Sequence, residues 1–254
     1  MWAKDRYHRI LSLLSVRGQA SNDLLMQELQ VSRETIRRDV LELEATGQLK
    51  RVHGGVVTLG PSPEPPFKTR IGSHAVEKRR IGLAAAALIQ PGMLCAIDTG
   101  TTTSAFATAL ASIPNVSVVT NSFDVAATIR GAQPNATIIL LGGNFGLDAP
   151  GTLGALAVSQ MEQFLPDVAI LSPVALDAAF GATSYDLAEA ELARAMIGRA
   201  ARLILLADRS KLGAMSRVGL CGCDEIDVLV TDRRADAANL SALKAKGVGE
   251  IVLA

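Results

Sequence analysis

The sequence has little that would tie the protein to a membrane, to an oxidising compartment or to a metal. Its 254 residues contain no apolar run near the roughly 18 residues needed to cross a bilayer. The segment after Met1 also lacks the apolar core of a signal peptide. Of only three cysteines, Cys95 lies in an apolar run, and Cys221 and Cys223 have no second cluster of ligands nearby. We therefore expect a cytoplasmic protein with no cofactor, no metal site and no membrane partner.

The sequence also lacks a net charge, since 25 lysines and arginines balance 25 aspartates and glutamates. Charge alone therefore neither indicates nor excludes a nucleic-acid partner. The composition, 49% apolar and 20% charged, is typical of a globular protein. Through residue 58 there are nine basic and seven acidic residues, so only the positions of the charges carry information.

Four prolines within residues 61–66 mark the clearest boundary. Such a run sustains neither a helix nor a central strand and is typical of a semi-rigid linker. The predicted organisation is a small domain over residues 1–58, a linker over residues 59–73 and a larger domain over residues 74–254.

Three helices are expected in the small domain. The first covers Asp5–Val16, the second starts at the N-cap Ser21, and the third runs from the N-cap Ser32 to Gly47. In the third helix the apolar residues at positions 36, 40 and 43 form one core-facing stripe, which leaves three arginines on the other faces. A short hairpin with a basic first strand follows over residues 49–58. This order suits a winged helix-turn-helix with its third helix in the major groove, although a basic helix face can also be merely solvated.

The larger domain alternates strand and helix patterns, which predicts an α/β fold with a mainly parallel sheet covered on both faces. The expected strands are Leu94–Ile97, Val116–Val119, Thr137–Leu141, Val168–Leu171, Leu203–Ala207 and Val228–Val230. The expected helices are Val76–Ile89, Thr103–Leu110, Phe123–Arg130, Gly154–Phe164, Leu187–Ala200 and Asp236–Lys246.

Polar residues follow several of these strands. After the first strand, the small hydroxyl residues around Gly100 can form an anion cradle, because backbone N–H groups, threonine hydroxyls and a helix N-terminus converge there. Thr and Gly also cap helices for structural reasons alone, so both interpretations stay open. Asn121, Gly142, Gly143 and Lys211 follow other strands. Since ligands bind outside the carboxyl ends of parallel strands, these residues outline one pocket.

The string from Val31 to Val40, continued by Arg51 and His53-Gly54-Gly55, resembles the DNA-binding signature of the DeoR/GlpR family of transcriptional regulators. Val40 stands where the family usually has leucine. By this resemblance the residues that contact double-stranded operator DNA are Ser32, Arg33, Thr35, Arg37, Arg38, Arg51 and His53. Arg37 lies near the core stripe, so a structural pairing with Asp39 or Glu44 is an alternative for it.

The larger domain resembles the sensor domain of the same family, which is similar in fold to ribose-5-phosphate isomerase, glucosamine-6-phosphate deaminase and the CoA transferases. The resemblance implies a phosphorylated sugar or related metabolite as effector. The residues expected to bind it are Asp98, Thr99, Gly100, Thr101, Thr102, Asn121, Gly142, Gly143, Asp208 and Lys211. The chain departs from the family over residues 172–177. That stretch and Glu189, Glu191 and Arg194 are expected at the sugar end of the pocket and leave the identity of the effector open.

The expected function is that of a sequence-specific repressor of a carbohydrate-catabolic operon, released from DNA by its effector. An activator remains open, because coupling between two sites can have either sign. A phosphosugar isomerase or deaminase fused to a DNA-binding domain is the alternative, but no carboxylate pair has a spacing that marks it as catalytic. One recognition helix contacts few base pairs, so we expect a homodimer or homotetramer assembled through the larger domain.

Overall fold

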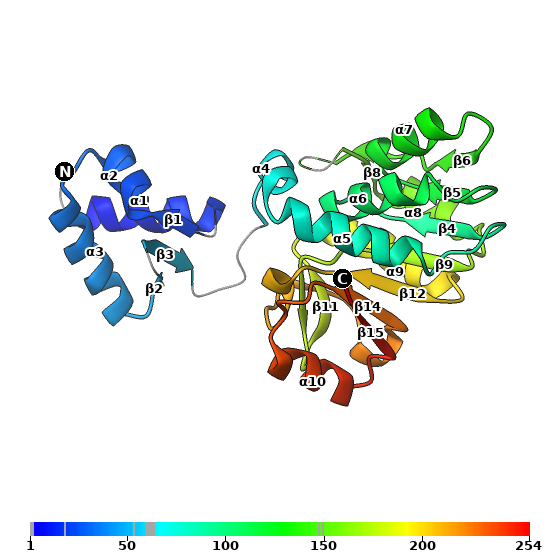
Figure 1. Ribbon diagram of the computed structural model, residues 1–254. Helices are drawn as coiled ribbons and strands as arrows, with labels where there is room; N and C mark the ends of the chain where they lie inside the picture. Colours follow the sequence, from blue (N-terminus) through cyan, green and yellow to red (C-terminus); the bar gives the residue numbers. More distant parts are fainter. Residues whose placement is uncertain (1–2, 18, 53, 59–63, 147, 149) are drawn as a thin grey trace. The chain divides into compact units, whose positions relative to one another are not determined.

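The computed structural model describes residues 3–17, 19–52, 54–58, 64–146, 148 and 150–254. The chain divides into two compact units, Met1–Pro65 and Pro66–Ala254 (Figure 1). Each unit has its own hydrophobic core.

The smaller unit combines three helices with a three-stranded antiparallel sheet in the order β1-β3-β2. Its core includes Ile10, Leu14, Leu25 and Ile36, all at most 1% exposed. The elements are α1 (Ala3–Arg17), β1 (Gln19–Ser21), α2 (Asn22–Leu29), α3 (Arg33–Ala45), β2 (Leu49–Val52) and β3 (Gly55–Thr58).

The helix boundaries of this unit confirm the predicted caps. The hydroxyl oxygens of Ser21 and Ser32 each accept a hydrogen bond from the backbone N–H three residues later. Gly47 has a φ of 65° directly after the C-cap of α3, a conformation that favours glycine. Strand β1 was not predicted, because three residues are too few to show an alternating pattern.

The larger unit contains a seven-stranded parallel sheet in the order β15-β14-β12-β9-β4-β5-β6. The strands in chain order are β4 (Leu94–Ile97), β5 (Ser117–Thr120), β6 (Thr137–Leu140), β9 (Val168–Leu171), β12 (Leu203–Leu206), β14 (Val228–Thr231) and β15 (Glu250–Leu253). The helices are α4 (Phe67–Gly72), α5 (Ala75–Ala86), α6 (Thr101–Leu110), α7 (Phe123–Ala132), α8 (Ala155–Met161), α9 (Leu187–Arg199) and α10 (Ala237–Ala245), with short 3-10 turns η1 (Arg209–Lys211) and η2 (Cys223–Glu225).

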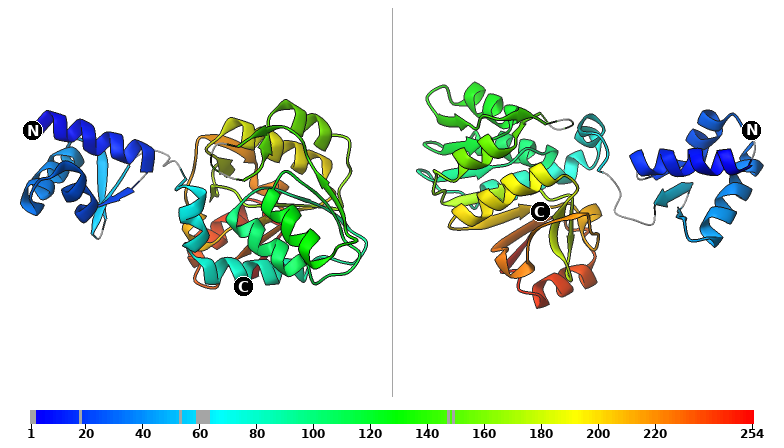
Figure 2. Two further views of the ribbon diagram at one scale, coloured as in Figure 1. Left: turned by 90° about the horizontal axis from the view of Figure 1, so that it is seen from above. Right: turned by 180° about the vertical axis from the view of Figure 1, so that it is seen from behind.

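Helices cover both faces of this sheet (Figure 2). On one face Ile81 of α5 and Phe106 of α6 share a buried cluster with Ile97 of β4. On the other face Ala96 of β4 shares a cluster with Met196 of α9. Successive residues of one strand thus face opposite layers, and the predicted parallel sheet with two helical layers is confirmed.

Two smaller sheets were not predicted. The strands β10 (Ala175–Asp177), β11 (Gly181–Ser184) and β13 (Val218–Cys221) form an antiparallel sheet, and β7 (Asn144–Phe145) pairs with β8 (Thr152–Leu153). Each strand has only two to four residues, so its pattern could not be separated from loop sequence.

The predicted linker over residues 59–73 is wrong in its second half. Residues 67–72 form the helix α4, and the larger unit begins at Pro66 rather than at residue 74. The prolines that disfavour a helix all precede Phe67, whose ring is buried. The prediction extended their effect too far along the chain. Residues 59–63 lie outside the described residues.

The three cysteines are buried and unbridged. Burial raises the pKa of the Cys95 and Cys221 thiols to about 12, which favours the inert thiol form. Among the described helices, none is both long and apolar enough to cross a membrane.

Candidate DNA-binding surface and effector site

Helix α3 separates its apolar and basic residues as predicted. The side chains of Ile36, Val40 and Leu43 are at most 3% exposed and pack in the core of the smaller unit. Arg33, Arg37 and Arg38 are exposed. Ser32 and Thr35, at the start of the helix, share a hydrogen bond of 2.9 Å between their hydroxyl oxygens. The N-terminal half of α3 therefore offers three guanidinium groups and two hydroxyls to a partner.

The alternative pairing of Arg37 with Asp39 or Glu44 is wrong. Arg37 lies 3.5 Å from Glu34, and both side chains are more than two-thirds exposed. An exposed pair of this kind contributes about 0.5 kcal/mol or less, so it does not compete strongly with a phosphate. The carboxylate of Asp39 instead accepts two hydrogen bonds from Arg6 of α1, at 2.6 and 2.7 Å.

The Arg6–Asp39 pair is a structural feature that the sequence analysis missed. Asp39 is 1% exposed and Arg6 is 15% exposed, and the two-pronged contact fixes α1 against α3. Nothing in the spacing of the two residues, 33 positions apart, identifies them as partners. A carboxylate on the apolar side of α3, between Ile36 and Val40, was the available signal, because a buried charge needs a partner.

Arg51 of the hairpin is tied to the recognition helix. Its guanidinium donates to Glu44 at 2.5 Å, and its backbone N–H donates to the same carboxylate at 2.9 Å. These hydrogen bonds, the backbone one first, hold the pKa of Glu44 below its usual value. The contact fixes β2 relative to α3 while Arg51 stays about half exposed. His53, predicted to contact DNA beside it, lies outside the described residues.

The predicted effector residues gather at one edge of the parallel sheet. After β4 the chain continues to β5 and β6 on one side, whereas β9, β12, β14 and β15 lie on the other. The sheet therefore reverses its direction of growth between β4 and β9, and crevices that bind ligands form at such switch points. The backbone N–H of Ser172, after β9, donates to Asp98, after β4, at 3.3 Å across this junction.

The loop from Asp98 to Thr102 joins β4 to the N-terminus of α6. Gly100 is the N-cap, and its carbonyl oxygen accepts the hydroxyl hydrogen bonds of Thr103 and Ser104 at 2.9 and 2.8 Å. The hydroxyl oxygens of Thr99 and Thr102 are buried without a hydrogen-bond partner among the described residues. No side chain caps α6, so the capping interpretation does not account for Thr99 and Thr102, whose hydroxyls remain available to a ligand.

Asn121 follows β5 and faces the same loop. Its amide nitrogen donates to the carbonyl of Thr152 at 3.0 Å, while its side-chain oxygen is buried with no partner in the described part of the chain. Gly151 closes this side, since a Cβ there would lie 2.8 Å from the Asn121 carbonyl oxygen and 3.2 Å from Cβ of Thr99. Thr99, Asn121 and Gly151 therefore form one wall.

Four further predicted residues have structural contacts of their own. The N–H of Gly142 donates to Gln160 at 2.6 Å, and Gly143, with a φ of 149°, lies too close to Leu153 for a side chain. Asp208 is buried and caps η1, accepting from Ser210. Lys211 donates to the carbonyl of Pro173 at 2.6 Å and lies 3.5 Å from the hydroxyl of Ser172. Lys211 thus extends toward the β9 side of the crevice, while the other three maintain local structure.

The residues expected at the sugar end of the pocket differ in their burial and in their contacts. Glu189 accepts from the hydroxyl of Ser184 at 3.2 Å and is half-buried. Glu191 is exposed, and Arg194 donates to the carbonyl of Gly219. Asp177 accepts the N–H of Ala179 at 2.7 Å. Among the residues that the structure describes, no group of three or more His, Cys, Asp or Glu side chains could hold a metal.

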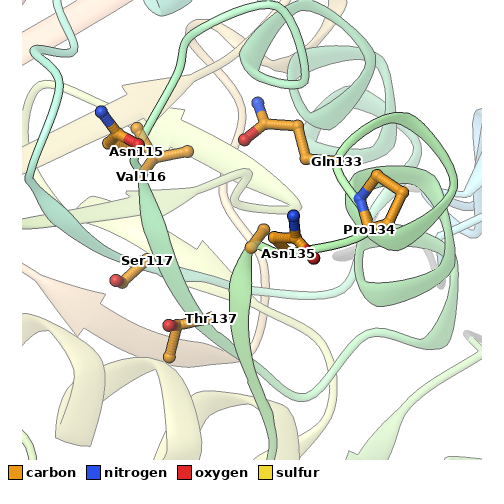
Figure 3. A pocket seen from close by; sticks show the side chains of 8 residues that line it. Asn115, Val116, Ser117, Gln133, Pro134, Asn135 and Thr137 are labelled. Atoms are coloured by element: carbon orange, nitrogen blue, oxygen red, sulfur yellow. The ribbon is translucent and has the colours of Figure 1, made fainter.

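A cavity of about 450 Å³ lies elsewhere, at the beginning of β5 and β6 (Figure 3). Because the strands are parallel, this is the opposite edge of the sheet from the Asp98–Thr102 loop. The lining residues are uncharged: Asn115, Val116, Ser117, Gln133, Pro134, Asn135, Ala136 and Thr137. The amide of Gln133 is already bonded to the carbonyls of Ala111 and Ile113. An anionic effector finds no cation in this lining.

Two family models match the chain. The DeoR-like helix-turn-helix domain matches residues 6–61, and the DeoR C terminal sensor domain matches residues 73–233. The chain belongs to the DeoR family. It is a DNA-binding transcriptional regulator, as the resemblance in its third helix and wing predicted.

Curated relatives of this DeoR-family chain match over nearly their whole length. The glycerol-3-phosphate regulon repressor of Escherichia coli K12 is 32% identical over 227 residues, which cover 89% of this chain and 90% of that protein. The HTH-type transcriptional regulator GlpR of Haloferax volcanii is 32% identical over 249 residues, covering 98% and 97%. A solved ribose 5-phosphate isomerase A from Methanocaldococcus jannaschii matches with a TM-score of 0.40 and 15% identity over 55% of each chain.

Proposed function

We propose that the protein is a cytoplasmic, homo-oligomeric repressor that binds operator DNA through α3 and its wing. A phosphorylated small metabolite binds at the switch point between β4 and β9 and lowers the affinity for DNA. The smaller unit supplies the DNA contacts, at Ser32, Arg33, Thr35, Arg37 and Arg38, with Arg51 and His53 from the wing. The larger unit supplies the effector site and the contacts between subunits.

One observation carries the effector site. The hydroxyls of Thr99 and Thr102 and the side-chain oxygen of Asn121 are buried without partners in the described structure. Buried polar atoms are nearly always hydrogen-bonded, because an unmade bond costs about 1–3 kcal/mol. Three such atoms on two adjacent strand ends indicate a site whose partner is a polar ligand.

The surroundings of these atoms favour an anion. Helix α6 begins at Thr101, directly after its N-cap Gly100, so its first-turn N–H groups and its dipole are directed at the same loop. Lys211 brings an ammonium group to the β9 side. A phosphate at the loop would accept hydrogen bonds from the threonine hydroxyls and the helix N-terminus. The Escherichia coli relative is named as a glycerol-3-phosphate regulon repressor. We therefore take glycerol 3-phosphate as the first candidate for the effector of this chain.

We propose that the site binds its ligand without transforming it. An isomerase needs a general base close to the reacting carbon. Of the carboxylates that could serve, Asp208 caps η1, Asp98 accepts from Ser172, Asp177 from Ala179 and Glu189 from Ser184. Each of these carboxylates thus accepts at least one hydrogen bond from the protein.

The test is a thermal-shift series with glycerol 3-phosphate, other phosphorylated sugars and the free sugars, on the wild type and on Thr99→Val. A ligand at 100 times its Kd should add about 2.7 kcal/mol of stability in the wild type. The variant, which lacks one unpartnered hydroxyl, should lose most of that shift. Equal shifts in both proteins would place the ligand elsewhere, and conversion of a sugar phosphate into product would support an enzyme.

A further inference from the structure

Helix α4 is fixed at its start by a residue far away in the sequence. The N-cap Pro66 has no side-chain hydrogen bond to the helix. Instead, both carboxylate oxygens of Asp148 lie 2.9 Å from the backbone nitrogen of Phe67, and one lies 3.0 Å from the guanidinium of Arg70. Asp148 therefore caps α4 from 81 residues away.

Asp148 is also close in sequence to one wall of the proposed effector site. Three residues further on, Gly151 is pressed against Thr99 and Asn121. The N–H of Thr152 donates to the Asn121 carbonyl at 2.9 Å, and the Asn121 amide donates back to Thr152 at 3.0 Å. A ligand that forms hydrogen bonds with the unpartnered side-chain oxygens of Thr99 and Asn121 lies directly against Gly151.

The end of α4 is fixed from the opposite side of the site. The ammonium of Lys78, a residue only 5% exposed, donates to the carbonyl of Arg70 at 2.6 Å. Its neighbour Glu77 accepts from Arg209 at 3.0 Å, and Arg209 belongs to the same turn η1 as Lys211. Both fixed points of α4 thus connect to loops that line the crevice.

Resting on the proposed function, we propose that Asp148 is the positioning residue through which occupancy of the effector site is communicated to α4. Since α4 is the first helix after residues 59–65, a change in its attachment acts on the segment that leads to the DNA-binding unit. Ligand binding displaces the wall at Gly151, Asp148 moves with it, and the start of α4 loses its cap.

The first test needs neither ligand nor operator. In the full-length protein, hydrogen exchange of residues 67–72 should become roughly tenfold faster in Asp148→Ala, because the capping contact is lost. Asp167→Ala is the matched control. Asp167 also accepts a backbone N–H, that of Leu94 at 2.8 Å, but at the opposite edge of the sheet. Unchanged exchange in Asp148→Ala would overturn the proposal.

Gly151→Ala tests the connection between wall and cap. The added Cβ must push Gly151 away from the Asn121 carbonyl, so exchange of residues 67–72 should rise as it does in Asp148→Ala. In the double variant the two effects should not add. Independent, additive effects would show that the wall does not act through Asp148. Exchange at β9, measured in parallel, confirms that each variant is folded.

The second test measures coupling. DNA selected from a random duplex library by the wild type is titrated with and without glycerol 3-phosphate. The ratio of the two DNA Kd values should fall by about threefold or more in Asp148→Ala and stay unchanged in Asp167→Ala. An unchanged ratio in Asp148→Ala contradicts the proposal. If glycerol 3-phosphate does not bind the wild type, that effector choice fails, and exchange in the double variant still decides whether Gly151 acts on α4 through Asp148.

Discussion

The two units present their candidate functional groups in opposite ways. On the smaller unit the arginines of α3 are exposed and charged. The buried carboxylate of Asp39 is paired with Arg6, and the N-terminus of α3 is capped by Ser32. In the larger unit the three oxygens on which the proposed effector site rests, those of Thr99, Thr102 and Asn121, are uncharged, buried and lack partners within the described structure. Water can solvate the exposed DNA-binding surface, whereas the buried oxygens of the proposed effector site gain hydrogen bonds only when a ligand or water enters.

The difference between the two units also affects the stability of the folded state. Exposed arginines cost the folded state little, because water solvates them. Buried oxygens without partners lower the stability of the empty site by about 1–3 kcal/mol each unless water enters. Substitutions should therefore separate the two units according to whether they remove satisfied or unsatisfied groups.

The largest effect is expected from the buried ion pair of the smaller unit. Asp39→Ala leaves the Arg6 guanidinium without the carboxylate that accepts its two hydrogen bonds, and should destabilise this unit by about 3 kcal/mol. Because the unit then unfolds more readily, DNA binding should be lost at a lower temperature than in the wild type. Glu34→Ala, which removes the partner of the exposed Arg37, should cost less than about 0.5 kcal/mol. Urea unfolding followed by circular dichroism measures the free energy of unfolding of both variants. Similar losses of stability in Asp39→Ala and Glu34→Ala would refute the distinction between the buried and the exposed ion pair.

The packing of the larger unit supplies the next effect. A Cβ on Gly82 of α5 would lie 2.8 Å from the Ala105 carbonyl oxygen of α6, so Gly82→Ala should cost about 2 kcal/mol. Gly131 of α7 has open space around its Cβ position, and Gly131→Ala should be neutral or slightly stabilising. Calorimetry should show both changes in the melting of the larger unit. Equal effects at the two positions would mean that α5 and α6 are packed less closely.

On the DNA surface, Arg38→Ala should weaken operator binding by roughly tenfold and reduce the dependence on salt, since one phosphate or base contact is lost. Arg199→Ala removes an exposed arginine of the larger unit and serves as the control. Fluorescence anisotropy at several salt concentrations gives both quantities. Wild-type affinity in Arg38→Ala would remove this side chain from the contacts. Effector-induced thermal stabilisation should be unaffected.

The smallest effect on stability, and the one that sharpens the comparison most, is expected from Thr102→Val. The hydroxyl is buried without a partner among the described residues, so its replacement by a methyl should leave the unliganded protein as stable as the wild type or slightly more so. Ligand affinity should nevertheless fall. A clear loss of stability on thermal unfolding would show that the hydroxyl has a structural role.

Much of the fold could be predicted because its central elements are long or strongly patterned. The buried strands Leu94–Ile97 and Val168–Leu171 are uninterrupted apolar runs, and the structure places them at the predicted residues. Strand β15 was missed because Glu250 opens it and only three apolar residues follow. Helix α4 was missed because six residues after a proline run show too little periodicity.

The candidate site was predictable in outline but not in its contacts. The carboxyl ends of parallel strands lie at one edge of a sheet, so the placement of Thr99, Thr102 and Asn121 at one edge followed from the predicted parallel sheet. That Asp208 caps η1, that Gly142 donates to Gln160, and that Asp148 caps α4 depend on tertiary distances. No local pattern encodes a partner that is 81 residues away.

The order of the elements along the chain also sets the order in which the two units are synthesised. Every element of the DNA-binding unit has been synthesised once Thr58 is added, but the crevice also needs the η1 turn, which ends at Lys211. At roughly 5–20 residues per second, a ribosome takes about 8–30 s to add that remaining stretch. Over this interval the chain carries its recognition helix but not yet the complete crevice in which we propose that the effector binds.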